Sequence, residues 1–566
     1  MNDKRLDRRA FVGAASAAGV LAAGSLGLRL AAAQDATPSA GEATPASSSG
    51  ESLVIDFAKA EPTELGPAIP PEFTDNEQNW PTEHGNLQGT RAAASSGIDS
   101  STVGSLEVAW TVPVQAASAY GSMTAAPVIV GDTVYLQDMS SNIWAIDKNS
   151  GEVKWTKEYN VGLLGPNGLA VSYGRVFGAL GDTAEAVCVD AETGEEQWRV
   201  TLSNNVYEGI DIAPLVYNNI VYISTVPGDS QSFYQGGSKG ILYGLDAATG
   251  HTLFQWDTTT EDLWGNFRLN SGGGLWHPPV VDDAGYLYFS VANASPYPGT
   301  EEFPAGSGRP GDNDYANSLV SLDVEAGKMR WYLNVKPHDL FDLDLHLSPI
   351  LTTVDIDGTS TPIVLTSGKL GYVIAARQDT GEELWRTPVG KHQNDDLQEL
   401  PMDDYVEVYP GTLGGVETPI AYADGVVFAP VYNNPTWFSA TDSEGRNSLQ
   451  DATGNLVAID AATGEILWDV EQPAGMLAGA AVANDVVFTG GLDGVVRGYN
   501  VTDGTEVFSW QASAGLNAPF SISGDYLFIP AGGPLIASSD TTEPETPQQA
   551  LIALKIGGGA SATPAS

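Results

Sequence analysis

The sequence predicts an all-β fold, namely an eight-bladed β-propeller of four-stranded antiparallel blades that is closed by its N- and C-terminal strands. Three observations lead to this prediction. One short pattern recurs along the chain, each copy ends on an aromatic residue at the same position, and the two ends of the repetitive region complete one another. Repeated strand–turn–strand units of this kind are typical of propellers, in which each unit packs on the next.

The repeat itself predicts a hairpin. In the copy AIDAATGEILW, Asp460 is expected to accept hydrogen bonds from backbone amides, and Gly464 to take the positive φ that the turn needs. Trp468 follows eight positions after the Asp, so a fixed turn places the aromatic ring identically in every unit, where it can dock on the neighbouring unit. The seven copies span 145–155, 188–198, 244–254, 321–331, 375–385, 458–468 and 498–508.

The ends of the region supply one more unit. The segment SLEVAWTVPV (105–114) has a strand with Trp110 and no turn before it, whereas ALIALKI (550–556) is a strand with no turn and Trp after it. Pairing these strands gives the eighth blade and closes the ring. The long gaps between aromatic residues, 254–331 and 385–468, must hold insertions, and insertions on a rigid scaffold commonly carry function.

The remaining segments define the domain limits. Residues 1–33 resemble a twin-arginine export signal, with Arg8 and Arg9 before a mildly apolar run and a small-residue cleavage pattern, which implies a periplasmic, extracellular or cell-surface location. Residues 34–75 and 557–566 are expected to be a disordered linker and tail, with the propeller between them at 76–556. No other run is long and apolar enough to span a membrane.

Charge and cysteine content exclude several functions. A net charge of −46 repels nucleic acid and anionic membranes. The acidity favours solubility or salt tolerance, or alternatively the attraction of a basic partner or divalent cations. The single cysteine, Cys188, rules out an intramolecular disulfide and covalent c-type haem, and its apolar surroundings indicate a packing role.

One stretch concentrates ionisable residues. VKPHDLFDLDLHL (335–347) contains Asp339, Asp342 and Asp344 with His338 and His346, two of only six histidines. Turn chemistry alone can explain such a loop, but the carboxylates also suit proton abstraction and hard cations such as calcium. The histidines are expected to be structural. An aspartate with an ordinary pKa of about 3.9 would be ionised at neutral pH.

Beyond the repeat, four ordered segments resemble the eight-bladed quinoprotein alcohol and glucose dehydrogenases, which bind pyrroloquinoline quinone (PQQ) and a metal. The resemblance implies that Trp276 of GGGLW (272–276) forms the floor under the quinone. It implies further that Asn293 of VANASPYPG binds the metal, that Asp342 of PHDLFDLD is the catalytic base and a metal neighbour, and that Lys369 of SGKLGYV reaches the quinone carbonyls.

The same resemblance identifies weaker candidates and some departures. The resemblance makes Asp344 a possible replacement metal ligand, as in lanthanide-using relatives. Charge alone makes Arg309 and Lys239 candidates to neutralise the PQQ carboxylates, because the chain has few cations. Asn167 stands where the family's arginine is expected, and Gln235 where its metal-binding glutamate is expected. The adjacent cysteines common in the alcohol dehydrogenases are absent from NVGLLGPNG (160–168), so backbone and small residues would cover the ring.

These observations favour an exported PQQ-dependent dehydrogenase of a small alcohol or sugar. It would use calcium or another metal, a lanthanide included, and would pass electrons to an external acceptor such as a basic cytochrome. The alternative is a PQQ-free propeller that acts as a binding or assembly scaffold. In that case Trp276 is ordinary core, Asn293 a turn former, Lys369 a solvated strand-end lysine and the Asp-rich loop a polar turn.

Overall fold

The computed structural model describes residues 57–557, except for 117, 119, 231–234, 447–448 and 537–547. The expected export signal (1–33) and nearly all of the expected tail therefore lie outside the described residues. Within the described ranges the helices are three short 3-10 turns: η2 (Pro71–Phe73), η3 (Val103–Ser105) and η4 (Leu449–Asp451). None of the helices in this part of the chain could cross a membrane.

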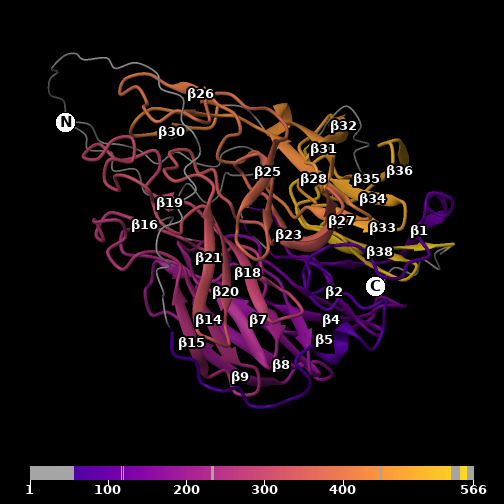
Figure 1. Cartoon of the computed structure of the whole chain (residues 1–566). Helices are drawn as coiled ribbons and strands as arrows, with labels where there is room; N and C mark the ends of the chain where they lie inside the picture. The colour runs from indigo at the N-terminus through magenta and orange to yellow at the C-terminus, as the bar shows by residue number, and fades with distance from the viewer. Residues whose placement is uncertain are drawn as a thin grey trace, which may run out of the picture.

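The predicted all-β fold of four-stranded antiparallel sheets is confirmed, and the described strands form eight such sheets (Figure 1). In chain order they are β2 (Val128–Val130), β3 (Thr133–Gln137), β4 (Ile143–Asp147), β5 (Val153–Lys157); β6 (Ala170–Ser172), β7 (Arg175–Leu180), β8 (Glu185–Asp190), β9 (Glu196–Thr201); β11 (Leu215–Tyr217), β12 (Ile220–Ser224), β14 (Ile241–Asp246), β15 (Thr252–Asp257); β17 (Val280–Val281), β18 (Tyr286–Val291), β20 (Ser318–Asp323), β21 (Lys328–Asn334); β22 (Ile350–Ile356), β23 (Thr359–Thr366), β24 (Tyr372–Arg377), β25 (Glu383–Pro388); β27 (Ala421–Ala423), β28 (Val426–Asn433), β31 (Thr453–Asp460), β32 (Ile466–Gln472); β33 (Ala481–Ala483), β34 (Val486–Gly490), β35 (Val495–Asn500), β36 (Glu506–Gln511); and β37 (Ser521–Ser523), β38 (Tyr526–Ala531), β39 (Ala550–Ile556) with β1 (Leu106–Pro113).

The turn of the repeat forms as its residues predict. Asp190 Oδ1 accepts the backbone N–H groups of Glu192 and Thr193, at 3.0 and 2.9 Å. Gly194 follows with a φ of 71°, a conformation that residues with a Cβ rarely adopt. A second constraint acts on this glycine, because a Cβ there would lie 2.7 Å from the ring of Trp155 in the preceding sheet. The turn glycines of most other copies likewise leave room for a neighbour's tryptophan, whereas Gly327 lies against the backbone of Phe57.

The predicted docking of the repeat's aromatic residues is confirmed. Trp155 packs on the turn of the next sheet and donates its indole N–H to Ala191 O, at 3.3 Å. The same contact joins Trp110 to Lys148 O and Trp468 to Val501 O, at 2.8 and 3.1 Å. One ring thus fills the interface and satisfies a turn carbonyl at each of these sheet junctions.

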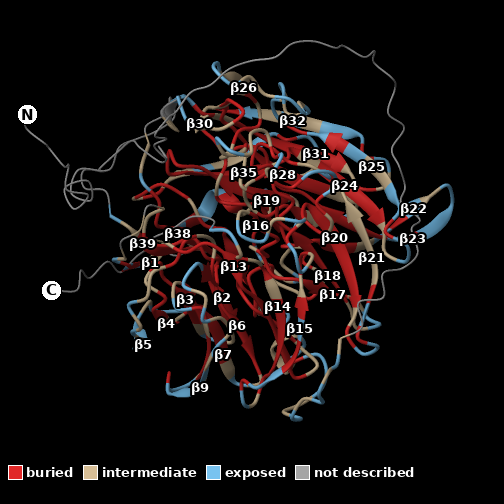
Figure 2. Ribbon diagram, turned by 90° about the vertical axis from the view of Figure 1, so that its left-hand side faces the viewer, coloured by how far each residue is buried: buried red, intermediate tan, exposed pale blue. Residues whose placement is uncertain are grey.

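The sheets follow one another in chain order, and the last lies beside the first (Figure 1). β1 pairs antiparallel with β39 from Leu106↔Ile556 to Pro113↔Ala550, with one irregularity near Trp110. β37 of this sheet contacts β2 of the first repeat sheet. Inner strands such as β7 are buried on both faces, whereas the residues of outer strands such as β9 are exposed or half-buried. In Figure 2 the colour accordingly changes from red in the interior to blue at the rim. Cys188 is fully buried in this packing, as expected.

Residues 80–97, here called the axial segment, run past the first strands of successive sheets. The backbone of this segment forms hydrogen bonds with the innermost strand of one sheet after another. Arg91 lies fully buried within it and donates to the carbonyl oxygens of Glu83, Ala480 and Phe520. The backbone pairs are Trp80–Ile129, Pro81–Val171, Leu87–Val281, Gln88–Leu351, Thr90–Tyr422, Arg91–Val482 and Gly97–Gly524.

The described part of the expected linker, residues 57–75, does not match the expectation of disorder. Phe57 stacks on Phe254 with ring centroids 4.8 Å apart, and its backbone N–H donates to Gly327 O at 3.0 Å. Phe254 is the repeat's aromatic residue at a position where most copies have Trp. Phe57 therefore adds aromatic surface at this junction, which explains why a polar, Pro-containing stretch is fixed against the sheets.

Three small sheets lie outside the eight four-stranded sheets. They contain β10 (Glu208–Gly209) with β13 (Val226–Pro227), β16 (Ser271–Gly272) with β19 (Ala294–Ser295), and β26 (Val406–Val408) with β29 (Thr436–Phe438) and β30 (Ser443–Glu444). In Figure 1, β26 and β30 lie at the top of the molecule and β16 and β19 at its left, away from β9 and β15 at the bottom. The insertions therefore form the loops around the candidate site.

Candidate active site

A cavity of about 530 Å³ lies between the sheets and the insertions, and its walls are mainly apolar. It brings together Trp276, Asp342, Asp344 and Lys369, which come from three separate sequence segments. The sequence-predicted floor, base, second carboxylate and cation are therefore neighbours in space. Such a concave, largely apolar site with a few converging charges is the usual form of a small-molecule site.

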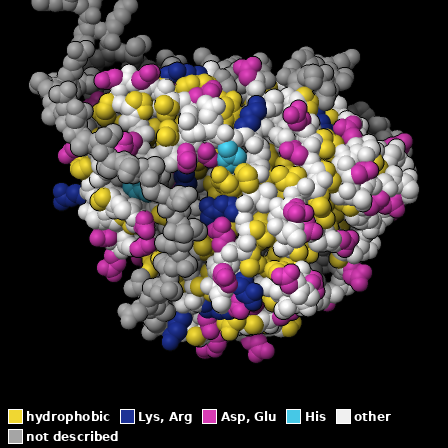
Figure 3. Space-filling view, turned by 45° about the horizontal axis from the view of Figure 1, so that its top comes forward, with side chains coloured by type: hydrophobic (Ala, Val, Ile, Leu, Met, Phe, Trp, Pro, Cys, Tyr) yellow, Lys and Arg dark blue, Asp and Glu magenta, His cyan; other side chains and the backbone are white. Residues whose placement is uncertain are grey.

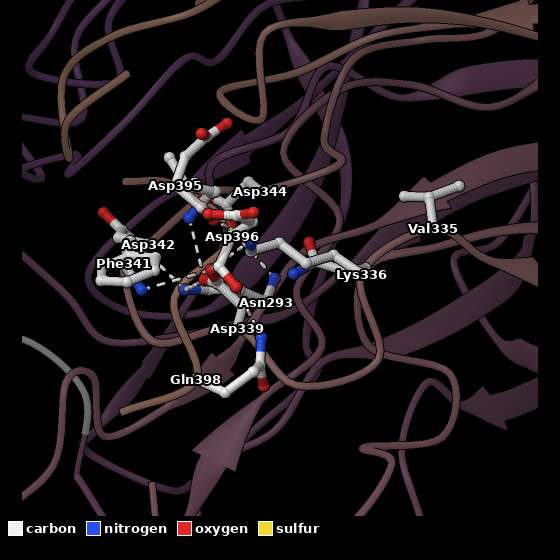
Figure 4. Close-up of polar contacts among 12 residues, drawn as sticks. Asn293, Val335, Lys336, Asp339, Phe341, Asp342, Asp344, Asp395, Asp396 and Gln398 are labelled. Carbon is white, nitrogen blue, oxygen red and sulfur yellow. Dashed lines mark hydrogen bonds and ion pairs between the residues drawn. The ribbon is translucent and has the colours of Figure 1, made fainter. Parts of the chain in front are cut away.

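The Asp-rich loop between β21 and β22 forms a hydrogen-bonded cluster around Asn293 (Figure 4). Asn293 Nδ2 donates to Asp342 Oδ1 at 3.0 Å, and its backbone N–H donates to Asp344 Oδ1 at 2.8 Å. Lys369 Nζ lies 3.1 Å from Asp342 Oδ2 and 2.7 Å from Asp344 Oδ2. One ammonium group thus bridges the outer oxygens of two buried carboxylates.

Asp342 does not have the ordinary pKa that the sequence led us to expect. Burial raises its pKa well above 3.8, and the neighbouring Asp344 raises it further, although the Lys369 ammonium opposes the rise. The physical reason is that the charged carboxylate loses its water and shares its single cation with a second carboxylate. Asp342 also holds a positive φ of 63°, so tertiary contacts impose its backbone conformation.

Asp339 has the turn-forming role that the sequence indicated. Its carboxylate accepts the backbone N–H groups of Phe341 and Leu343, at 3.2 and 2.9 Å. Arg309 is buried behind the loop and donates to the backbone oxygens of Asp339 and Pro296. These contacts fix the loop on which Asp342 is presented to the cavity.

The GGGLW segment places Trp276 through close backbone packing. β16 pairs with β19, with Gly272 opposite Ala294, so the segment lies directly beside Asn293. A Cβ on Gly272 would lie 2.6 Å from Asn293 O, which leaves room only for glycine. The motif therefore ties the Trp276 floor to the same strands that orient the aspartate cluster.

Gly165 of the loop 160–168 packs directly against the Trp276 ring, whereas the sequence analysis expected this loop to cover the quinone ring. A Cβ on Gly165 would lie 2.7 Å from the Trp276 ring. Asp211 Oδ1 fixes the loop by accepting the backbone N–H groups of Leu164 and Gly165, at 2.9 and 3.1 Å. Asp211 Oδ2 has no hydrogen-bond partner among the described residues, and burial raises the pKa of Asp211 to about 7.

The structure does not bring the remaining candidates to the cavity wall. Asn167 is buried beside it, where it pairs with Thr124 Oγ1 at 3.1 Å and donates to Asp138 O. Arg309 supports the Asp-rich loop instead of facing the cavity. Lys239 pairs with Asp257, and Gln235 is exposed on the preceding loop. These candidates were chosen by residue type and position in the sequence, and neither reveals the direction in which a side chain points.

Two groups of residues were missed by the sequence analysis. Glu417 lines the cavity from the insertion before β27, whose sequence has no recognisable spacing, and Tyr432 lines it from β28. His277 also lines it and pairs through Nδ1 with Glu83 Oε1 of the axial segment, at 3.1 Å. Burial alone would raise the pKa of Glu83, but His277 and Arg91 lower it below its ordinary value. The pair joins residues almost two hundred positions apart, so local pattern could not reveal it.

The charged cluster has only part of a metal site. Asp342, Asp344 and the Asn293 amide are hard oxygen donors of the kind that calcium prefers. In the described parts of the chain, no three His, Cys, Asp or Glu side chains are arranged to hold a metal ion. Lys369 occupies the position between the two carboxylates.

Comparison with known proteins places the chain in a family. The β-propeller domain model of glucose, ethanol and alcohol dehydrogenases, named PQQ, matches residues 80–171 and 203–397, slightly more than half of the 566 residues. The chain belongs to this PQQ family. It is therefore grouped with quinoprotein dehydrogenases, as the sequence indicated. A second model, that of the outer membrane protein assembly factor BamB, matches residues 369–542.

Individual relatives of the PQQ-family chain are distant. The quinohemoprotein alcohol dehydrogenase of Comamonas testosteroni is 24% identical over 510 residues, which cover 77% of this chain and 69% of the relative. The lanthanide-dependent methanol dehydrogenase of Methylacidiphilum fumariolicum is 23% identical, with 77% and 81% covered. The crystal structure of the Comamonas enzyme superimposes with a TM-score of 0.73 at 20% identity and covers 86% of this chain and 82% of that one. This likeness shows the fold.

Proposed function

We propose that this PQQ-family protein is an exported dehydrogenase that oxidises an alcohol or sugar with PQQ and a bound metal, and that it passes the electrons to an external acceptor. The observation that carries the proposal is the convergence of Trp276, Asp342, Asp344 and Lys369 in one cavity. A flat aromatic floor, a base and a cation are the groups that a quinone-dependent oxidation requires. The alcohol dehydrogenases and methanol dehydrogenases among the relatives support this reaction class.

We further infer that the eight sheets are the blades of one closed propeller around this cavity. The support is the β1–β39 pairing, the contact between β37 and β2, and the axial segment that links successive sheets. Closure matters for catalysis because a ring of blades holds residues from distant segments in a fixed geometry.

The aromatic residue and the cation that line the cavity suit the quinone part of PQQ, whereas Arg309 and Lys239 do not reach the cavity to neutralise its carboxylates. Trp276 lines the cavity, and Lys369 is the cation beside the aspartates. Gly165 packs against the Trp276 ring, so a quinone stacked on that ring would have to share it with this loop. Buried polar atoms on the cavity wall, including Tyr432 Oη and Thr412 Oγ1, have no hydrogen-bond partner among the described residues. Such atoms indicate that a polar ligand belongs in the cavity.

A metal would be held by Asp342 and Asp344 with the amide oxygen of Asn293. Lys369 would then turn from the carboxylates toward the cofactor, because a divalent or trivalent cation competes for the same oxygens. The two carboxylates are compatible with calcium, and the lanthanide-dependent relative supports testing a trivalent ion as well.

In this proposal PQQ, when bound, supplies the electrophilic carbonyl that accepts a hydride from the substrate carbon. Asp342 takes the proton of the substrate hydroxyl. Burial raises the pKa of Asp342 in the protein alone, and a bound cation would lower it again and so keep the carboxylate ionised, as a base must be. Lys369 would supply positive charge to the quinone oxygens, and Trp276 with the apolar cavity wall would exclude water from the bound group.

The scaffold alternative rests on the second family match, residues 369–542. This range contains repeats but lacks Trp276, Asn293 and Asp342. A scaffold would not need charged residues from outside that range to meet in a buried cavity, so the dehydrogenase is the better supported function.

Reconstitution tests the proposal. Purified protein is incubated with PQQ and calcium, or with PQQ and a lanthanide, passed over a desalting column and scanned for quinone absorption. We expect about one retained PQQ per chain with at least one metal, together with dye-linked oxidation of alcohols or glucose. If neither metal supports stoichiometric retention, the dehydrogenase function must be abandoned in favour of a scaffold.

A further inference from the structure

Residues 389–395, here called the brace, join the insertion after β25 to the turn that presents Lys369. Within the brace, His392 Nδ1 lies 2.7 Å from Asp395 Oδ2, and His392 Nε2 lies 2.9 Å from Gly371 O. An ionised carboxylate and a carbonyl oxygen can only accept hydrogen bonds. Both ring nitrogens must therefore donate, which only the doubly protonated imidazolium can do. The two contacts thus require the charged form of His392.

The turn that presents Lys369 depends on this contact. Gly371 N–H donates to Gly368 O at 3.0 Å, so Lys369 occupies the second position of a four-residue turn. Gly371 O accepts two further hydrogen bonds from the brace, one from Val389 N–H at 2.9 Å and one from the His392 ring. Gly371 has a φ of 72°, and a Cβ there would lie 3.0 Å from His392 Nε2. Glycine is therefore required both by the turn and by the close approach of the imidazole.

The brace also contacts the Asp-rich loop on the other side of the charged cluster (Figure 4). Lys336 Nζ donates to Asp395 O at 2.7 Å and lies 3.9 Å from Asp339 Oδ1. Asp395 thus binds Lys336 through its carbonyl oxygen and His392 through its carboxylate. The brace therefore links the loop that carries the aspartates to the turn that carries Lys369.

The surroundings of the His392 ring contain one dominant charge, the Asp395 carboxylate. Tyr372 packs against the ring, with centroids 4.6 Å apart. Burial raises the pKa of Tyr372, and Asp395 adds to the rise, so the phenol beside the imidazole is uncharged. The His392 and Asp395 side chains are only 18% and 14% exposed, which limits screening of their contact by water. The other charged groups nearby are Arg386 on β25, Lys391 and Asp396 on the insertion, and Glu407 on β26.

We propose that His392 is a positioning residue for Lys369 and makes the placement of this lysine depend on pH, an inference that rests on the proposed dehydrogenase function. In its imidazolium form, His392 fastens the brace to the Lys369 turn by a charge-assisted hydrogen bond. When the ring loses a proton, one nitrogen presents a lone pair to an acceptor oxygen, and that contact becomes repulsive. The fastening is therefore present at low pH and is lost as the pH rises.

NMR of the histidine side chains tests the charge state. The full chain without PQQ is labelled with 15N-histidine, and long-range 1H–15N correlations are recorded at pH 7. We expect two protonated ring nitrogens for His392, whose signal is assigned by its loss in His392→Gln. Asp395→Asn keeps an acceptor oxygen and removes the charge, so it should weaken the imidazolium signal at the same pH. A neutral His392 ring in the parent would overturn the proposal.

The affinity for PQQ at pH 6.5 and pH 9 tests the positioning role in the calcium-loaded protein. In His392→Gln the amide can still donate to Gly371 O, but it carries no charge and does not titrate. We expect the parent to lose about tenfold more affinity between the two pH values than His392→Gln, because only the parent loses a charged donor. His251→Gln, at an exposed repeat turn, is the matched control and should respond like the parent. An equal pH response of the parent and His392→Gln would reject the positioning role.

Failure of the brace can be distinguished from failure of the proposed function. If PQQ binds at neither pH, amide hydrogen exchange is measured on the chain without PQQ. The Val389 amide, which donates to Gly371 O, should lose about tenfold more protection between pH 6.5 and pH 9 in the parent than in His392→Gln. That result would support the brace without the dehydrogenase, and equal changes would reject it. Asp395→Asn replaces His392→Gln in both comparisons if the latter does not fold, and its loss should likewise be smaller than the parent's.

Discussion

Asp342 combines a base and a buried charge in one side chain. Its two oxygens are each committed, one to Asn293 Nδ2 and one to Lys369 Nζ, and its backbone is held at positive φ. Burial favours the neutral acid, while Lys369 and any bound metal favour the carboxylate. Whether Asp342 is ionised, and so able to act as a base, therefore depends on how much positive charge lies beside it.

Replacing Asp342 by Asn separates the base from the shape of the site. The amide keeps the volume and one carbonyl oxygen but cannot accept the substrate proton, so turnover should fall on the order of 100-fold in a metal-saturated assay. PQQ retention should be largely preserved, and the melting temperature should not fall, because a desolvated carboxylate is removed. Steady-state rates, quinone absorption and thermal melts measure the three effects.

Asp339→Asn on the same loop is the matched control. Asp339 accepts backbone N–H groups of Phe341 and Leu343, which an amide oxygen can still do in part. It should cost stability but leave most of the turnover. A parent-like rate for Asp342→Asn would place the base elsewhere in the cavity.

At the scale of elements, the loop 160–168 depends on one buried acid. Asp211 Oδ1 holds the backbone of Leu164 and Gly165 over Trp276, and no second chain contact satisfies Oδ2 in the described structure. The loop is thus fixed by the hydrogen bonds that its backbone donates to Asp211, which lies between β10 and β11. Gly165 is required in this loop because a larger residue would collide with the Trp276 ring.

The raised pKa of Asp211 predicts a pH-dependent effect on stability. A folded-state pKa of about 7 against an ordinary 3.8 means that the folded protein binds more protons than the unfolded chain between these values. The contribution of Asp211 is therefore present below pH 3.8 and is lost as the pH rises toward 7. Asp211→Asn keeps the acceptor oxygen, so its free energy of unfolding relative to the parent should improve by about 2–3 kcal/mol between pH 5 and pH 8.

Asp190→Asn, at an exposed repeat turn, is the control for this pH series. Backbone N–H groups lower the pKa of Asp190, so it is ionised in both states throughout the same range and should give a pH-independent difference. Denaturant unfolding of the parent and both variants at pH 5 and pH 8 provides the measurement. An Asp211→Asn effect that is equal at both pH values would show that Asp211 ionises as an ordinary acid.

The whole molecule is strongly acidic, with a formal net charge of −46. Acidic side chains are scattered over the upper face, without one dominant patch (Figure 3). A field of this sign attracts basic partners in general, and it does not select one docking position. The proposed external acceptor is accordingly expected to be cationic.

Electron transfer to a basic acceptor should therefore depend on salt. With a basic cytochrome as acceptor, the second-order rate should fall as ionic strength rises through about 0.2 M, where screening becomes short-ranged. A small uncharged dye is the control, and its rate should change little over the same range. Rates with the cytochrome that do not respond to salt would argue against electrostatic steering.

The sequence by itself determined the repeat architecture, because turn chemistry and aromatic spacing act over fewer than a dozen residues. Asp190, Gly194 and Trp155 have the roles that their pattern predicted. The cavity candidates Trp276, Asp342 and Lys369 were found through motifs of similar length. Tertiary structure alone decided which other side chains reach the cavity. Arg309 turns toward loop carbonyls and Lys239 toward Asp257, whereas Glu417, Tyr432 and His277 line the cavity. The physical reason is that burial, shared charge and close backbone approach arise between segments far apart in the chain, and no local pattern encodes them.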